Sequence, residues 1–396
     1  MPCSATLARM VAIASENGKV LDPEELLEAA EAERARIGRF NLAVVGGTGV
    51  GKSSLVNAIF GKGLAPTGVG LPVTRGIDYY TNTDGSLGIW DFEGFEVGNS
   101  RSPADIVRDN LETIASGPAG QRIAAVWYCI ASTAARLQPA EIDVISEFKD
   151  QGLPVVIVLT KVTRVRSGLT REWTVSDDAR RMREWLEEPT TPEGTRLPLR
   201  VDAVALTAAV DQGKFGGPAH GLDQLITVTL ELSPDDHDEA IKVAQKISLP
   251  LKRELCRRAI APAVTAATAA ALTPIPVADA VALAGIQLAM MGKICTYYGI
   301  DLTVVGGGQL MTQLGLQFAG KALARSLLKL VPGAGMVINA GVAAGLTAAT
   351  GEAWMRFCEA IYVGKVNLDD IENAWKDYAP TFAQVVAAVQ RHRTRS

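Results

Sequence analysis

The sequence predicts an α/β domain with a mostly parallel sheet and helices on both faces, followed by an all-α domain rich in alanine and glycine. Three observations support this prediction. Apolar, β-prone segments alternate with amphipathic ones between residues 40 and 232, which is typical of a parallel sheet. A glycine-rich turn at 46–51 joins the first strand to a helix. From residue 259 onward, long uncharged stretches of small and apolar residues follow.

The spacing of apolar residues places the individual elements. Strands are expected at 40–45, 77–82, 86–91, 122–130, 154–160 and 200–206. Helices are expected at 53–60, 103–115, 138–149, 177–187 and 221–232. Capping residues predict an earlier helix at 23–36 and a later one that opens at 233–236. The later helix would carry on one face Ile241, Ala244, Ile247 and Leu251.

These elements divide the chain of 396 residues into three parts. Residues 1–38 are expected to form a helical segment that packs on the C-terminal helical module. Residues 39–232 would form the α/β domain, and residues 233–396 the helical domain.

Residues 46–53 fit the pattern G-x-x-x-x-G-K-[ST] of a phosphate-binding loop. A strand precedes the loop and a helix follows it, so backbone N–H groups and the helix dipole favour an anion there. We expect Lys52 to reach the β- and γ-phosphates and the Ser53 hydroxyl to bind Mg²⁺. The sequence therefore predicts a P-loop NTPase fold that binds a nucleoside triphosphate. The residues expected at the phosphates are Gly46, Gly47, Thr48, Gly49, Val50, Gly51, Lys52, Ser53 and Ser54.

Two later segments carry residues suited to sense the γ-phosphate. Asp91 opens a D-x-x-G sequence at a strand end, where it would hold a Mg²⁺-bound water while the Gly94 N–H contacts the γ-phosphate. Thr74 lies in the segment 70–76 and is placed to close on Mg²⁺ and the γ-phosphate, the alternative being a surface turn. The predicted catalytic residues are thus Lys52, Thr74 and Gly94, and the predicted metal ligands are Ser53, Thr74 and Asp91.

Two more strand ends are suited to bind the base, at Thr160-Lys161 and at Thr207-Ala208. In this order the motifs resemble the five motifs of a Ras-related GTPase domain over about residues 38–232. The wording GKSSLVNAIFG is similar to the septation, immunity-related and dynamin-like branches. The resemblance implies GTP or GDP as ligand. It also implies that the Lys161 stem stacks on guanine and that the Thr207-Ala208 backbone contacts the guanine carbonyl.

The chain departs from this family in the base motif and beside the γ-phosphate. Thr163 stands where the family has aspartate, and a hydroxyl offers guanine one comparable acceptor and no charge. We expect guanine selectivity to fall by about 1–3 kcal/mol, so that adenine nucleotides become candidates. Phe95 stands where signalling relatives carry a water-orienting glutamine, and Gly49 where potassium-activated relatives carry asparagine. Hydrolysis is therefore expected to be slow and to need self-association or a partner.

Residues 251–363 resemble an uncharacterised helical domain that follows GTPase domains in bacterial proteins and is often described as membrane-associated. About 20 uncharged residues can span a bilayer as a helix. Against spanning, alanine and glycine outnumber leucine, prolines interrupt 259–278, and Asp279 and Lys293 add charges. Two alternatives are open: a soluble bundle that inserts only conditionally at a surface, and a domain that spans the membrane constitutively.

Composition and charge narrow the classes further. With 48% hydrophobic and 21% charged residues the chain is not disordered, and a net charge of −4 argues against a nucleic-acid partner. Five dispersed cysteines without a C-x-x-C pair indicate reduced thiols rather than disulfides or zinc. We expect a cytoplasmic protein that associates with the inner face of a membrane, peripherally or integrally.

Together these features predict a Mg²⁺-dependent GTP-binding protein and slow GTPase, a nucleotide switch coupled to a membrane-associated helical domain. The expected partners are GTP, a membrane surface or bilayer, and a second copy bound through the G domain. Arg75 and Arg101 are candidate arginine fingers across such a dimer, or else surface arginines. One alternative is a nucleotide-dependent binding module with negligible catalysis or relaxed ATP/GTP specificity. Another is a ribosome-assembly GTPase, against which the charge and the lack of an RNA-binding appendage count.

Overall fold

The computed structural model describes residues 23–64, 77–92, 101–134, 137–167, 172–272, 278–300, 335–366 and 371–378. The chain divides into two compact units. One unit contains Ile37–Leu249, and the other combines Met1–Arg36 with Pro250–Ser396. The first unit is an α/β domain and the second is helical, as the sequence predicts.

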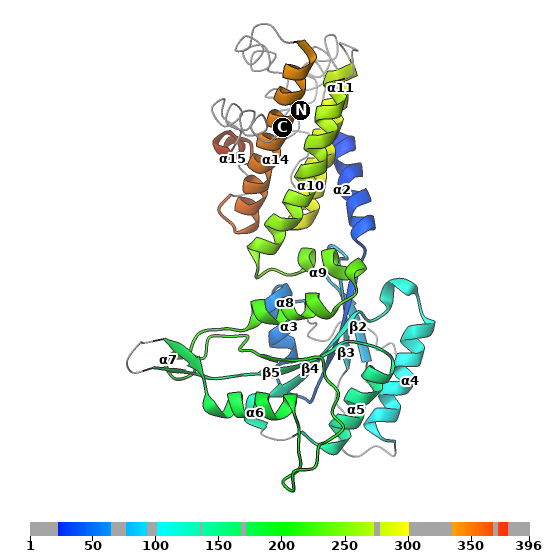
Figure 1. Ribbon diagram of the computed structural model, residues 1–396, viewed down its shortest axis with the longest axis vertical. Coiled ribbons are helices and arrows are strands. Elements are labelled where there is room, and N and C mark those ends of the chain that lie inside the picture. The colour runs from blue at the N-terminus through cyan, green and yellow to red at the C-terminus, as the bar shows by residue number, and fades with distance from the viewer. Residues whose placement is uncertain are drawn as a thin grey trace, which may run out of the picture. The chain divides into compact units, whose positions relative to one another are not determined.

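The α/β unit is built on a six-stranded sheet with the order β2-β3-β1-β4-β5-β8 (Figure 1). Its strands are β1 (Phe40–Val45), β2 (Ile77–Thr81), β3 (Leu87–Phe92), β4 (Ala125–Ala131), β5 (Val155–Thr160) and β8 (Ala203–Leu206). Only the β2–β3 pair within this sheet is antiparallel, and the other neighbours run parallel. The carboxyl ends of the parallel strands therefore share one edge, which is where open α/β sheets bind ligands.

Helices cover both faces of the sheet because successive strand residues point to opposite sides. On one face, the Trp127 ring of β4 stacks on Phe60 of α3 (Lys52–Phe60), with ring centroids 5.8 Å apart. Its indole N–H donates to Thr229 Oγ1 of α8 (Leu222–Leu232) at 2.9 Å. The next residue, Tyr128, belongs to the core of the opposite face. That core includes residues of α4 (Pro103–Ser116), α5 (Pro139–Asp150) and α6 (Asp177–Glu187).

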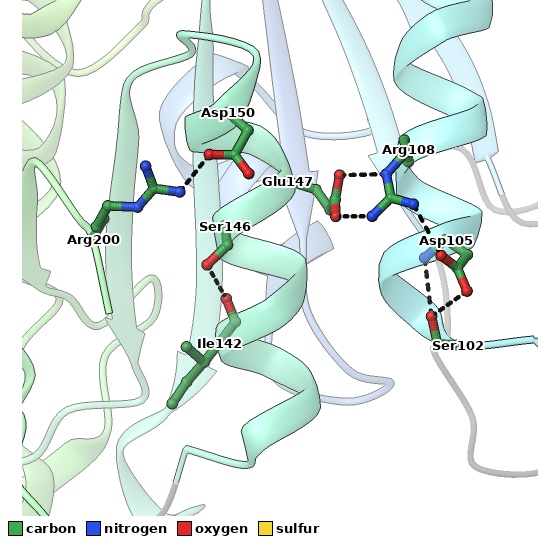
Figure 2. Close-up of polar contacts among 8 residues, drawn as sticks. All are labelled: Ser102, Asp105, Arg108, Ile142, Ser146, Glu147, Asp150 and Arg200. Carbon is green, nitrogen blue, oxygen red and sulfur yellow. Dashed lines mark hydrogen bonds and ion pairs between the residues drawn. The ribbon is translucent and has the colours of Figure 1, made fainter. Parts of the chain in front are cut away.

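A charged clamp joins α4 to α5 on this second face (Figure 2). The Arg108 guanidinium makes a bidentate pair with the Glu147 carboxylate and also donates to Asp105 at 3.1 Å. Ser102 caps α4 by accepting the N–H of Asp105. The clamp satisfies its charges internally, so we assign it to the docking of α4 on α5.

The expected strands and helices of this unit are observed with shifts of a few residues at their ends. Sequence analysis missed a short hairpin of β6 (Arg164–Arg166) and β7 (Trp173–Val175), and the single turn α7 (Gly213–Gly216). These elements are too short for a periodic apolar pattern, and the hairpin carries two arginines in its first strand. The hairpin matters for the site because it begins directly after Thr163.

The helix expected to open at 233–236 is broken in two, so that prediction is wrong. A 3-10 turn (Asp235–His237) leads into α9 (Asp238–Ala244), and α10 (Leu249–Ala270) starts afresh. Between them the buried Gln245 side chain accepts the N–H groups of Ile247 and Ser248 at 3.0 and 2.7 Å. It thereby satisfies backbone donors that a continuous helix would satisfy itself. The α/β unit consequently ends at Leu249 rather than at residue 232.

The helical unit contains α2 (Pro23–Ile37), α10, α11 (Ala278–Tyr298), α14 (Gly335–Tyr362) and α15 (Ile371–Tyr378). α2 packs on α11 through a buried carboxylate, because Glu33 accepts the Tyr297 hydroxyl at 2.7 Å and lies 3.3 Å from Lys293. Gly292 permits this approach, since a Cβ there would lie 2.8 Å from the Leu26 carbonyl oxygen.

The remaining helices of this unit are joined by an ion pair and an aromatic cluster. Arg253 of α10 pairs with Glu359 of α14 through two bonds of 2.6 and 2.5 Å. Trp354 and Phe357 of α14 pack edge-on against Trp375 of α15. Among the described residues, none of the helices combines the length and the apolar character that crossing a membrane requires.

Candidate nucleotide-binding site

The phosphate loop connects β1 to α3 at the carboxyl edge of the sheet. Three of its glycines have φ in the left-handed region: Gly46 at 139°, Gly49 at 78° and Gly51 at 110°. A Cβ at Gly46 would lie 2.3 Å from the Cys129 carbonyl oxygen of β4. The sequence motif therefore reflects two separate needs, a backbone that only glycine adopts readily and a close approach to the neighbouring strand.

Side chains from three elements hold the carbonyl groups of this loop. Lys52 Nζ donates to the Gly46 oxygen at 2.8 Å. Thr160 Oγ1, at the end of β5, donates to the Val50 oxygen at 2.5 Å, and Lys161 Nζ donates to the Gly49 oxygen at 2.6 Å. With these carbonyls engaged, the loop leads into the N-terminus of α3, whose orphan N–H groups and dipole favour an anion. The predicted base motif and the predicted phosphate motif thus lie side by side.

Oxygen ligands for a divalent cation lie next to this loop. Asp91 Oδ1 lies 4.0 Å from Lys52 Nζ, with side chains 15% and 10% exposed respectively. Asp91 is placed there by β3, in which it pairs with Val44 of β1 just before the loop. Ser53 is exposed in the first turn of α3, as is Ser54. A carboxylate and a hydroxyl at a phosphate site form the donor set that Mg²⁺ accepts.

The backbone after β5 is held in an unusual conformation. Lys161 has φ 55°, the only positive φ of a described non-glycine residue, and its carbonyl accepts the Ser132 hydroxyl at 3.0 Å. Val162 N–H then donates to the Thr207 oxygen at 3.0 Å. The loop after β5 is thereby tied to the loop after β8, as base recognition by both loops requires.

The predicted backbone contact of Thr207-Ala208 with the base meets a geometric difficulty. The Thr207 N–H donates to the Leu159 oxygen at 2.8 Å, and the Ala208 N–H donates to the His220 oxygen at 3.0 Å. Both donors are therefore used inside the protein. The Thr163 side chain is exposed, while its carbonyl accepts the Ser176 N–H at 3.1 Å.

Sequence reasoning missed two side chains that hold these base loops, Gln212 and His220. Each lies within 3.3 Å of the Val162 carbonyl oxygen through an Nε2 atom. The only available signal was the glycine after His220, which precedes a helix in the manner of a cap.

Several predicted residues fall outside the described part of the chain: Thr74, Arg75, Gly94 and Phe95. Arg101 is described, and its guanidinium forms an exposed pair with Asp109 at 2.7 Å. Burial raises the pKa of the Cys129 thiol, beside Gly46, to about 12. That thiol therefore stays neutral and adds no negative charge behind the loop.

Comparison with known families identifies domains in both units. Residues 41–161 match the family model described as "50S ribosome-binding GTPase", and residues 235–381 match a domain of unknown function (DUF697). No curated protein matches this chain. The chain therefore carries a P-loop GTPase domain followed by a helical domain of unknown function.

Solved structures of low identity are also similar to parts of the chain. NFeoB from S. thermophilus, bound to GDP·AlF4⁻ and K⁺, is 16% identical with TM-score 0.27, covering 89% of this chain and 99% of that one. A dimerization-deficient mutant of Toc33 from Arabidopsis thaliana is 16% identical with TM-score 0.33, covering 55% and 91%. A bacterial selenocysteine-specific elongation factor, EF-Sec, is 13% identical with TM-score 0.28. There the match covers 49% of this chain and 28% of the factor's length.

Proposed function

We propose that this protein is a Mg²⁺-dependent GTP-binding protein and slow GTPase that works as a nucleotide switch. The observation that carries the proposal is the geometry around Lys52. Its ammonium group bonds to the Gly46 carbonyl at 2.8 Å and lies 4.0 Å from Asp91, at the N-terminus of α3. A triphosphate in the loop would replace the carbonyl as the partner of Lys52, which then stabilises charge on the β- and γ-phosphates.

The residues proposed to hold Mg²⁺ are Ser53, Asp91 and Thr74. Ser53 and Asp91 fit this role by their oxygen donors and their place beside Lys52. When bound, Mg²⁺ neutralises phosphate charge and orients the γ-phosphate. Thr74 and Gly94 are proposed to sense that phosphate and to move when it is lost, which is the switch.

Hydrolysis is proposed to be slow because Phe95 has no group that can orient a water molecule. A second copy of the G domain, or a partner, would supply the missing contact. The rival proposal is a binding module with negligible catalysis.

Relaxed base specificity is a second candidate property, and two observations favour it. Thr163 offers no carboxylate to guanine, and the N–H groups of Thr207 and Ala208 are already bonded within the protein. Each missing hydrogen bond to guanine would weaken discrimination against adenine by about 1 kcal/mol.

A competition titration tests base specificity. Protein with Mg²⁺ is loaded with a fluorescent GTP analogue and challenged separately with GTP, GDP, ATP and XTP. We expect GTP and GDP to displace the probe at lower concentration than ATP, which keeps the GTPase assignment. Equal displacement by ATP would overturn guanine specificity and make the protein a general nucleotide switch.

The helical unit is proposed to associate with a membrane surface at its cytoplasmic face and to receive the nucleotide-dependent change. Its support is the alanine- and glycine-rich composition of 259–278 and 330–351. Flotation with anionic lipid vesicles tests this, and we expect the full-length chain to float. Failure to float together with sedimentation on 50S ribosomal subunits would favour the ribosome-binding alternative instead.

A further inference from the structure

His220 lies directly before α8 and reaches the loop that follows β5. Its ring Nε2 lies 3.0 Å from the Val162 carbonyl oxygen. The residue is 8% exposed, so this bond is shielded from water. A carbonyl can only accept, so Nε2 carries the proton in this contact.

The backbone of the same residue pairs with the loop that follows β8. His220 N–H donates to the Ala208 oxygen and Ala208 N–H donates to the His220 oxygen, both at 3.0 Å. Gly221, at φ 75°, presses this segment against β8, because a Cβ there would lie 1.9 Å from the Leu206 oxygen. One residue therefore contacts both loops, through its ring and its backbone respectively.

Other groups fix the same peptide unit and define what His220 adds. Gln212 Nε2 donates to the Val162 oxygen at 3.3 Å, and Val162 N–H donates to Thr207. Val162 lies between Lys161 and Thr163, the residues proposed to face the base. Burial lowers the pKa of His220, as does the charge of Arg164, so the ring is neutral at pH 7.

We propose that His220 is a positioning residue for base recognition, which holds the loops after β5 and β8 in one fixed register. The inference rests on the proposed function. Because Thr163 brings no carboxylate, discrimination depends on weaker polar groups whose strength falls steeply with small displacements. The placement of the loops then decides how much affinity the nucleoside adds to that of the phosphates.

The test compares His220→Leu, which removes the donor, with His220→Gln, which keeps an Nε2 donor. Dissociation constants are measured with Mg²⁺ for GTP, ATP and inorganic tripolyphosphate, and folding is checked by thermal unfolding. The readout is the ratio of the tripolyphosphate constant to the GTP constant, which is the affinity gained from the nucleoside. We expect His220→Leu to lower this ratio about tenfold, the value of one well-placed hydrogen bond. Tripolyphosphate binding should stay within about twofold of the parent, and His220→Gln should keep most of the ratio.

An unchanged ratio in a folded His220→Leu protein would overturn the inference, as would an equal loss of GTP and tripolyphosphate binding. A parent protein that gains no affinity from the nucleoside would instead overturn the proposed function itself. If His220→Leu does not fold, Gln212→Leu carries the test, because it removes the longer bond to the same carbonyl. It should lower the ratio in the same direction by a smaller factor, and no change would again count against the inference.

Discussion

At the residue scale, Gly46 sets the path of the phosphate loop. Its φ of 139° and the 2.3 Å approach of a Cβ to the Cys129 oxygen leave no room for a side chain. We predict that Gly46→Ala displaces the loop from β4 and weakens GDP binding at least about tenfold, since such strain costs about 1–3 kcal/mol.

Gly47→Ala is the matched control for this prediction. A Cβ at Gly47 would meet only Val50 Cγ1 at an ordinary 3.8 Å. Calorimetric titration of both variants with GDP checks the difference. Equal binding by the two would show that the approach to Cys129 does not constrain the loop.

Which site residues the sequence could predict depends on how local their signal is. Gly46, Lys52 and Thr160 lie in short motifs next to buried strands, and the structure brings all three together. His220 and Gln212 act on Val162 from about fifty residues away and belong to no motif. Their role arises from the pairing of two loops, which a single sequence does not reveal.

At the element scale, the docking of α2 on α11 depends on the charge of Glu33. Burial alone would raise the pKa of Glu33, but hydrogen bonds from Arg36 and Tyr297 and the charge of Lys293 outweigh it and lower the pKa below 4.5. The charged form is therefore favoured in the folded state. Its stabilisation is fully present above the unfolded pKa and is lost as the pH falls through the lowered folded value.

We predict that Glu33→Gln lowers the free energy of unfolding by about 2 kcal/mol at pH 7. The difference from the parent should shrink as the pH falls below 4.5, because the parent carboxylate then protonates. Urea unfolding at several pH values measures this, with the exposed Glu28→Gln on the same helix as control. A difference that is constant with pH would contradict the assigned charge.

The break between α9 and α10 rests on one side chain. Gln245 is fully buried and bonds to the backbone of Lys242, Ile247 and Ser248. We predict that Gln245→Met, which keeps the volume, lowers the free energy of unfolding by about 2–3 kcal/mol by leaving these groups unpaired. Gln224→Met, at an exposed position of α8, is the control in the same urea titration. A stability loss no larger than that of the control would show that Gln245 does not hold the break.

The elements themselves differed in how far the sequence could place them. Strands β1 and β5 are buried along their whole length, and their uninterrupted apolar runs made them visible. The break at Gln245 escaped notice because the apolar positions on either side continue a helical spacing across it. The short β6–β7 hairpin has no apolar period of its own.

At the scale of the whole molecule, the proposed need for self-association predicts a concentration-dependent rate. We expect GTP turnover per molecule to rise with protein concentration, because Phe95 leaves a single copy without a group that orients water. Phosphate release measured across a range of protein concentrations checks this. Negligible turnover that is unchanged at every concentration would favour the binding-module alternative.

The central claim is that the phosphate loop of the α/β unit binds a guanine nucleotide through Lys52. The most direct measurement is calorimetric titration with GDP and Mg²⁺ of the parent, Lys52→Ala and Lys62→Ala. Lys62 is exposed and lies beyond the end of α3, so its variant makes the same change of charge away from the loop. We predict that Lys52→Ala weakens binding about a hundredfold, or roughly 3 kcal/mol, while Lys62→Ala matches the parent. No binding by the parent, or equal binding by the parent and Lys52→Ala, would contradict the claim.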